Sequence, residues 1–171
     1  MQALLKAFWD IALWRRDPGQ LPDSMTLVTF TAAAYAALSA VQSWMIYGMD
    51  RLLARTGADL ALTVLLVWAL LALTRRTHRL NQTLSAVLGT GAMLSPLVIL
   101  LLALRGPADA SQVVALLVWA GSIGVILWFT FILGHIVRSA LDTGLFTGVA
   151  IAVTYVVASA AALTRLFPEG A

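Results

Sequence analysis

Five long apolar runs dominate this sequence and limit what it can fold into. They lie at residues 25–47, 58–74, 83–104, 113–137 and 144–166. Each is close to the length of about 20 residues that crosses a hydrocarbon core about 30 Å thick. Their apolar residues are continuous rather than alternating, which favours helices over barrel strands, the two structures that satisfy every backbone hydrogen bond in lipid. We therefore predict an all-α polytopic membrane protein, one membrane domain over residues 1–171, with five transmembrane helices in a compact bundle.

The composition agrees with a bilayer as the surrounding solvent. Hydrophobic residues make up 61% of the chain and charged residues 11%, against about 45–50% and about 25% in soluble domains. Lys and Arg lie between the apolar runs, so the net charge of +3 indicates membrane topology rather than a nucleic-acid partner. The absence of cysteine excludes disulfides and thiolate metal sites, and we expect no cofactor.

The distribution of Lys and Arg predicts the orientation. One side of the membrane would hold Lys6, Arg15, Arg16, Arg75, Arg76, Arg79 and Arg138, and the other Arg51, Arg55, Arg105 and Arg165. The side with more basic residues is usually cytoplasmic. The excess of arginine and alanine is typical of a GC-rich bacterial genome. We therefore predict a multi-pass protein of the bacterial inner (plasma) membrane, with its N-terminus cytoplasmic and its C-terminus periplasmic.

Residues 1–17 are too charged to cross a membrane. On a helix, Gln2, Lys6 and Asp10 would gather on one side, while Phe8 and Ile11 face another. This pattern predicts an amphipathic helix at the cytoplasmic membrane interface. Alternatively, the helix packs on the cytoplasmic ends of the transmembrane helices, and both descriptions can hold together.

The search for chemistry gives few candidates. With the predicted boundaries, every acidic residue lies in a loop, at a helix end or in the N-terminal helix, and Asp59 falls at the start of the second span. Coupled transporters usually carry an ionisable group at membrane depth, so this placement disfavours proton or cation coupling. No serine-hydrolase, Walker or dinucleotide motif is present. We therefore predict that the protein is not an enzyme and assign no catalytic or metal-binding residue.

One polar group stands at the end of the fourth apolar run, in "FILGHIVRSALDTG" at residues 131–144. His135, Arg138 and Asp142 recur at helical spacing, and Arg138 can reach Asp142 four residues later. We predict that this face lines the cytoplasmic end of the bundle. The simpler interpretation is that the segment is the exit from the membrane and the turn before the fifth span.

Three further features concern packing. Gly144, Gly148 and Ala152 form a small-residue seam, which suits close helix packing within the bundle or in a homodimer. Pro96 should bend the third span, and such a bend can open a cavity. The repeated string "LLVWA", at residues 65–69 and 116–120, raises the possibility of two related helical hairpins.

The segment "ALWRRDPGQLPDS", residues 12–24, leads directly into the first of the five spans. In this layout the chain resembles small bacterial members of the Yip1-like membrane protein superfamily. The resemblance implies a short amphipathic segment and a proline before a five-helix bundle. It also implies a scaffold or adaptor role, and it transfers no functional residue.

These observations lead to a functional expectation. The short predicted loops leave no extramembrane domain for catalysis, whereas the seam and the amphipathic arm offer binding surfaces. We expect a non-enzymatic interaction, assembly or scaffold component, with another membrane protein or a second copy of the chain as its partner. The alternative is a small transporter, channel or permease subunit, suggested by the proline and by the possible hairpin repeat.

Overall fold

A computed structural model describes residues 2–105 and 112–167 as an all-helical bundle. Its α-helices are α1 (Gln2–Ala12), α2 (Met25–Tyr47), α3 (Leu52–Leu73), α4 (Leu80–Leu104), α5 (Gln112–Leu141) and α6 (Leu145–Leu166). Two short 3-10 helices lie at Pro18–Gln20 and Thr77–Arg79. Within the described residues, five helices are long and apolar enough to cross a membrane. The predicted fold class is therefore confirmed, and the chain has the character of a multi-pass membrane protein.

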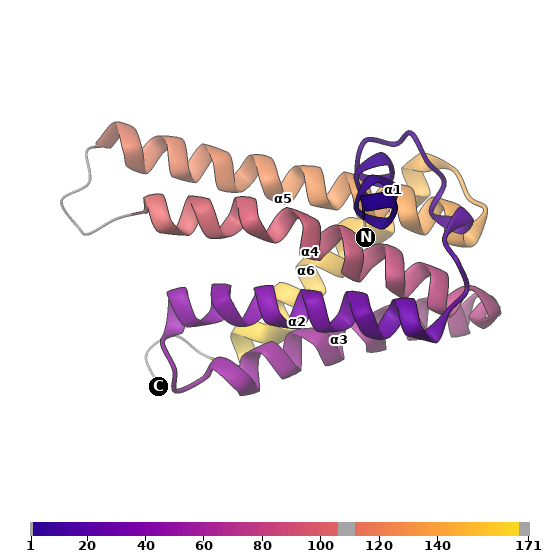
Figure 1. Ribbon diagram of the computed structural model, residues 1–171, viewed down its shortest axis with the longest axis horizontal. Helices are drawn as coiled ribbons and strands as arrows, with labels where there is room; N and C mark the ends of the chain where they lie inside the picture. Colours follow the sequence, from indigo (N-terminus) through magenta and orange to yellow (C-terminus); the bar gives the residue numbers. More distant parts are fainter. Residues whose placement is uncertain (1, 106–111, 168–171) are drawn as a thin grey trace.

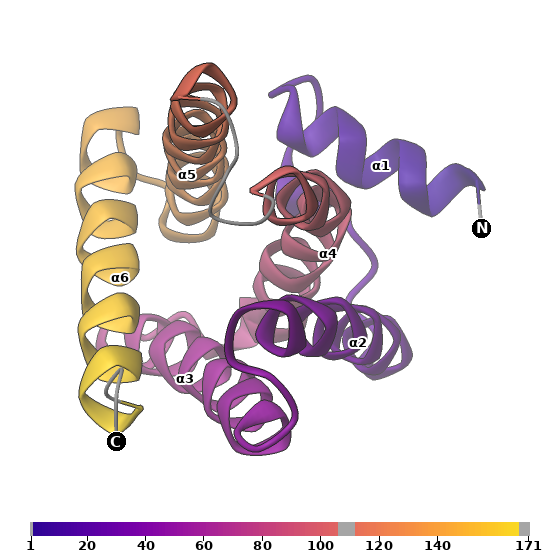
Figure 2. The ribbon, with the colours of Figure 1, turned by 90° about the vertical axis from the view of Figure 1, so that its left-hand side faces the viewer.

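The bundle has two distinct ends, which Figure 1 shows at the right and the left. One end carries Arg76, Arg79 and Arg138 and is called the basic end. There α3 and α5 finish, α4 and α6 begin, and α1 lies nearby. The opposite end, where α2 finishes, α3 begins and α6 finishes at Leu166, is called the C-terminal end. Along the long axis, α2, α4 and α5 are seen nearly end on, while α1 and α6 are seen from the side (Figure 2). The last helix therefore crosses the others obliquely.

The centre of the bundle is α4, which contacts α1, α2, α3 and α5. Residues 83–92 of this helix are all buried. Many of them are small, including Ser85, Ala86, Gly89 and Gly91, and small residues let neighbouring backbones approach closely in a membrane. The core thus lies around the first half of α4, and the second half of this helix is more exposed.

The helix boundaries differ from the predicted ones most at α3. This helix begins at Leu52 rather than at residue 58, because Arg55 finds a partner inside the bundle and does not have to remain in a loop. Elsewhere α4 begins at Leu80 rather than at 83, and α5 extends over Gln112–Leu141 rather than 113–137. The first and last helices are Gln2–Ala12 and Leu145–Leu166, where 1–17 and 144–166 were predicted; α2 has the predicted bounds.

The N-terminal helix packs on the bundle through its predicted apolar face. Ala7, Phe8, Ile11 and Ala12 are buried, and the indole Nε1 of Trp128 donates a hydrogen bond to the Ala12 carbonyl at 3.2 Å. Gln2 and Lys6 are exposed on the other side. The structure thus has α1 lying across α4 and α5, and its apolar face is covered by the chain itself.

The two proposed hairpins pack differently. α5 and α6 make an extensive mutual contact, whereas α3 lies mainly against α2 and α6, with fewer contacts to α4. Figure 2 shows α3 beside α2 and α6, with α4 nearer the centre. The repeated "LLVWA" string therefore does not mark two equivalent structural units.

Candidate functional site

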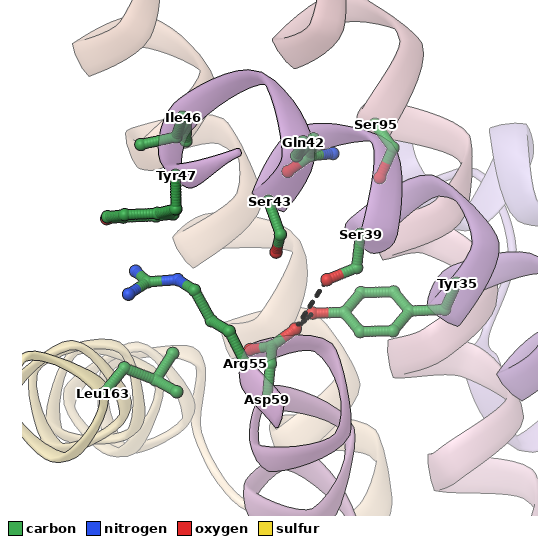
Figure 3. A pocket seen from close by; sticks show the side chains of 10 residues that line it. All are labelled: Tyr35, Ser39, Gln42, Ser43, Ile46, Tyr47, Arg55, Asp59, Ser95 and Leu163. Atoms are coloured by element: carbon green, nitrogen blue, oxygen red, sulfur yellow. Dashed lines mark hydrogen bonds between the residues drawn. The ribbon is translucent and has the colours of Figure 1, made fainter. Parts of the chain in front are cut away.

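A polar cavity of about 210 Å³ lies toward the C-terminal end of the bundle. Its lining comes from α2, α3, α4 and α6, and Figure 3 shows the side chains: Tyr35, Ser39, Gln42, Ser43, Ile46, Tyr47, Arg55, Asp59, Ser95 and Leu163. Most of these are polar, although every one belongs to a helix long enough to cross a membrane. This concentration of polar groups inside the apolar bundle is the strongest candidate for a functional site.

Asp59 supplies the carboxylate of this cavity. It lies seven residues after Leu52, the first residue of α3, which is about 10 Å along the helix at 1.5 Å per residue. Its Oδ2 accepts hydrogen bonds from the Tyr35 hydroxyl at 2.8 Å and from Ser39 Oγ at 3.2 Å. The prediction placed Asp59 at the start of the second span. Because α3 begins at Leu52 rather than at residue 58, Asp59 lies about two helical turns inside the helix, and its placement at a helix end is wrong.

Tyr35 reaches Asp59 because α4 leaves room for its ring. A Cβ placed on Gly91 would lie 2.9 Å from Cε2 of Tyr35, closer than carbon atoms normally approach. One helical turn beyond Asp59 on α3, Thr63 Oγ1 accepts a hydrogen bond at 3.0 Å from the hydroxyl of Tyr155 on α6. Two tyrosine hydroxyls from opposite sides thus hold the polar face of α3.

Arg55 lies one helical turn from Asp59 and has a different partner. Its guanidinium carbon is 3.9 Å from the centroid of the Tyr47 ring, a cation–π contact. In Figure 3 the side chain extends toward Tyr47 while Asp59 is directed toward Tyr35. In the described part of the chain, ion pairs within 4.0 Å occur only at the basic end. Two opposite charges therefore face one cavity without neutralising each other directly.

α4 closes another side of the cavity near its proline. Ser95 lines the cavity, and its Oγ donates a hydrogen bond to the Gly91 carbonyl at 3.0 Å. Pro96 lies inside α4, where it has no N–H to donate to the carbonyl four residues earlier. Figure 1 shows α4 changing direction along its length. The predicted bend and the cavity therefore occur in the same part of the bundle.

The regular spacing of polar residues on α2 and α3 is the sequence feature that indicates this site. Arg55, Asp59 and Thr63 recur every four residues on α3, and Tyr35, Ser39 and Gln42 follow a four- and three-residue spacing on α2. Such spacings place residues on one face of a helix. Gln42 is part of this polar lining.

The predicted polar group at the basic end is not assembled as one site. His135 stacks on Trp14 with ring centroids 5.4 Å apart, and its Nε2 lies 3.2 Å from the Arg16 carbonyl, so Nε2 carries the proton. Its Nδ1 is buried and has no hydrogen-bond partner in the described residues. The histidine therefore holds the segment after α1 against α5.

Asp142 forms ion pairs with Arg76 and Arg79 rather than with Arg138. The Arg79 Nη1 to Asp142 Oδ1 distance is 3.0 Å, and Arg76 Nη1 contacts Oδ2. The helix ends at Leu141, and Asp142 has φ 47°, so it leaves the helical path that the spacing argument assumed. Hydrogen bonds from Arg76 and then Arg79 hold the pKa of the Asp142 carboxyl below its usual value. Arg138 is exposed.

A second carboxylate ties the N-terminal segment to the same end. Asp17 Oδ1 accepts hydrogen bonds from Ser139 Oγ and from the Gly19 N–H, and Arg79 Nη1 donates to the Ser139 carbonyl at 2.8 Å. The hydrogen bond from Ser139 is the main cause that lowers the pKa of Asp17. The basic end is therefore a network of structural contacts joining the loop after α1 to α4 and α5.

The small-residue seam is used inside the chain. A Cβ on Gly148 would lie 2.4 Å from the Gly134 carbonyl oxygen, and Ala152 is fully buried. Gly144 has no atom within 4 Å of such a Cβ and stands at the N-terminus of α6. Two of the three predicted seam residues thus pack between α5 and α6, and Gly134 is the partner that the sequence did not indicate.

Comparison with protein-family models, with curated proteins and with solved structures gives no match. The geometry described above is therefore the basis for any functional proposal.

Proposed function

We propose that this chain is a small transporter or permease subunit that binds a small polar ligand in the cavity at the C-terminal end of the bundle. The observation that supports this proposal is the position of Asp59, about 10 Å inside a membrane-spanning helix and on the wall of a cavity. Asp59 is about a third of the way along α3, and ionisable residues inside membrane-spanning segments are costly and commonly mark ligand or ion pathways.

The proposed orientation places this cavity on the periplasmic side of a bacterial inner membrane. Seven of the eleven Lys and Arg residues lie at the basic end or in the N-terminal segment, and four at the other end, which favours a cytoplasmic basic end. Arg55 now belongs to the cavity, so only three basic residues remain in or beside the connections of the periplasmic end. A ligand would then enter from the periplasm.

An assembly or scaffold role is the alternative proposal, and the Yip1-like resemblance remains a prediction that favours it. Both surfaces that suggested this role are occupied within the chain. The apolar face of α1 is buried on α4 and α5, and Gly148 and Ala152 are buried against α5. A partner would have to bind the outer sides of the helices. In the described residues, no feature of these sides separates a surface for a protein partner from a surface for lipid.

Uptake into proteoliposomes tests the leading proposal. Radiolabelled amino acids, amines and small organic acids would be offered to vesicles containing the wild type, Asp59→Asn or the matched control Asp50→Asn, whose carboxylate lies exposed in the α2–α3 turn. We expect at least one solute to enter through the wild type and the control, and at least tenfold more slowly through Asp59→Asn. Uptake that never exceeds that of empty vesicles, or that Asp59→Asn leaves unchanged, would contradict the proposal.

A further inference from the structure

The two charges of the cavity are separated although their spacing favours pairing. Arg55 and Asp59 are four residues apart on α3, a spacing at which side chains of opposite charge normally meet. In this structure Tyr47 holds the guanidinium at 3.9 Å from its ring centroid, and Tyr35 and Ser39 donate hydrogen bonds to the carboxylate. Among the described residues, each charge is thus held by uncharged groups, and each keeps the capacity to bind a ligand group of opposite charge.

We propose that the cavity binds a small zwitterion, with its ammonium group at Asp59 and its carboxylate, sulfonate or phosphate group at Arg55. The inference rests on the proposal that this cavity takes a small polar ligand, and it specifies the chemical class of that ligand. Figure 3 shows the two charged side chains extending from one face of α3, with the space between them bordered by Ser43 and Tyr47.

Charge complementarity favours this class over simple ions. A cation bound at Asp59 would also experience the positive charge of Arg55 one turn away, and an anion bound at Arg55 would experience the negative charge of Asp59. A zwitterion aligned with the pair meets an opposite charge at both ends and leaves the cavity neutral. Both side chains are half-buried, and an opposite charge offsets part of the cost of removing each of them from water.

The volume of the cavity sets the size of the ligand. The cavity measures about 210 Å³, below the range of about 300–1,000 Å³ that is common for ligand pockets. A small ligand such as a small amino acid, taurine or ethanolamine phosphate matches this size.

Two sources can supply this chemistry at a membrane surface. One is a free zwitterion from the aqueous phase, and the other is the ethanolamine phosphate headgroup of a phospholipid. Both present an ammonium group a few atoms from an anionic oxygen. The cavity lies toward one end of the membrane-spanning helices, which both sources can reach, so the experiment has one arm for each.

In the first arm, binding is measured by microcalorimetry on the full-length protein in phosphatidylglycerol nanodiscs. The probes are glycine, taurine and ethanolamine phosphate, compared with ethanolamine as the cation and with acetate and inorganic phosphate as the anions. In the second arm, native mass spectrometry compares retention of phosphatidylethanolamine and phosphatidylglycerol. We expect at least one zwitterion, free or lipid-borne, to bind at least tenfold more tightly than every ion of single charge.

Variants identify the two charged contacts. Asp59→Asn and Arg55→Gln are each expected to weaken zwitterion binding at least tenfold. Asp50→Asn and Arg165→Gln remove exposed charges at the same end and should leave binding unchanged. Arg55→Lys and Asp59→Glu keep the charges, so binding within tenfold of the wild type by these two variants separates a lost contact from a misfolded bundle, and the thermal midpoint of each variant checks its fold.

Three results would overturn the inference. They are equal binding of ethanolamine and ethanolamine phosphate, binding that Arg55→Gln leaves intact, and failure of every zwitterion to bind in both arms. In the first two cases the proposed function would stand with a cation as the ligand. If, in addition, no solute of any charge entered the proteoliposomes, the proposed function would fail as well.

Discussion

The contact between α5 and α6 gives the sharpest test of the packing, through the substitution Gly148→Val. A Cβ at Gly148 would lie 2.4 Å from the Gly134 carbonyl oxygen and 3.0 Å from the Cβ of Arg138. The nearest obstacle is a backbone atom, so the helices must separate by about 1 Å to restore van der Waals contact. Separation also disturbs Ala152, which is fully buried in the same seam.

The expected cost is at the upper end of the range for overpacking, about 3 kcal/mol. This corresponds to roughly a hundredfold change in the unfolding equilibrium constant, at tenfold per 1.4 kcal/mol. The matched control is Gly124→Val in the interior of α5, where a Cβ meets no atom within 4 Å. The control should change the unfolding free energy by less than about 0.5 kcal/mol.

Equilibrium unfolding by SDS in mixed micelles, followed by tryptophan fluorescence, measures both variants. If Gly148→Val is as stable as the wild type, or if Gly124→Val loses as much as Gly148→Val, the close approach of α5 and α6 at this seam is refuted. If Gly148→Val is stable and only converts a dimer to a monomer, the seam belongs to a homodimer instead.

Three more predictions follow from other parts of the bundle. Phe8→Ala removes the buried ring of α1 and should weaken its docking by about 3 kcal/mol, measured as faster limited proteolysis of residues 13–24. Asp142 has a pKa below its usual value, so its contribution to stability is present above pH about 4 and is lost as the pH falls through the folded-state pKa. The difference in thermal midpoint between the wild type and Asp142→Asn should therefore shrink below pH 4; a constant difference would exclude the ion pairs as its source. The chain has no cysteine, so Ser43→Cys in the cavity should react with a membrane-impermeant thiol reagent added from the side proposed to be periplasmic, as should Asp50→Cys. Thr154→Cys, exposed on the outside of a helix that can cross the membrane, should not react. If Asp50→Cys is labelled and Ser43→Cys is not, the cavity is closed to water.

The polar lining of the cavity illustrates why sequence reasoning missed the site. A stretch such as residues 52–57, with Arg55 among leucines and alanines, has a low mean hydropathy and is naturally assigned to a loop, which leaves Asp59 at the start of the predicted span. It becomes helical because Tyr35, Ser39 and Tyr47 lie opposite these charges on α2. Those partners are remote in sequence, and the residues 52–59 by themselves do not indicate them.

The sequence by itself determined the all-helical architecture, the five spans and the apolar face of α1. These features depend on local properties, namely the length of each apolar run and the helical period of the polar residues. A bilayer acts on these properties directly, because a spanning segment must be long and apolar enough and must satisfy its own backbone hydrogen bonds. Tertiary structure decided which small residues meet, since Gly148 meets Gly134, while a Cβ on Gly144 would have no described atom of another segment within 4 Å. It also directed Asp142 to Arg76 and Arg79 rather than to Arg138. Finally, it brought Asp59 and Arg55 to one cavity without pairing them, because the depth and the partners of a charged side chain are set by the helices packed around it.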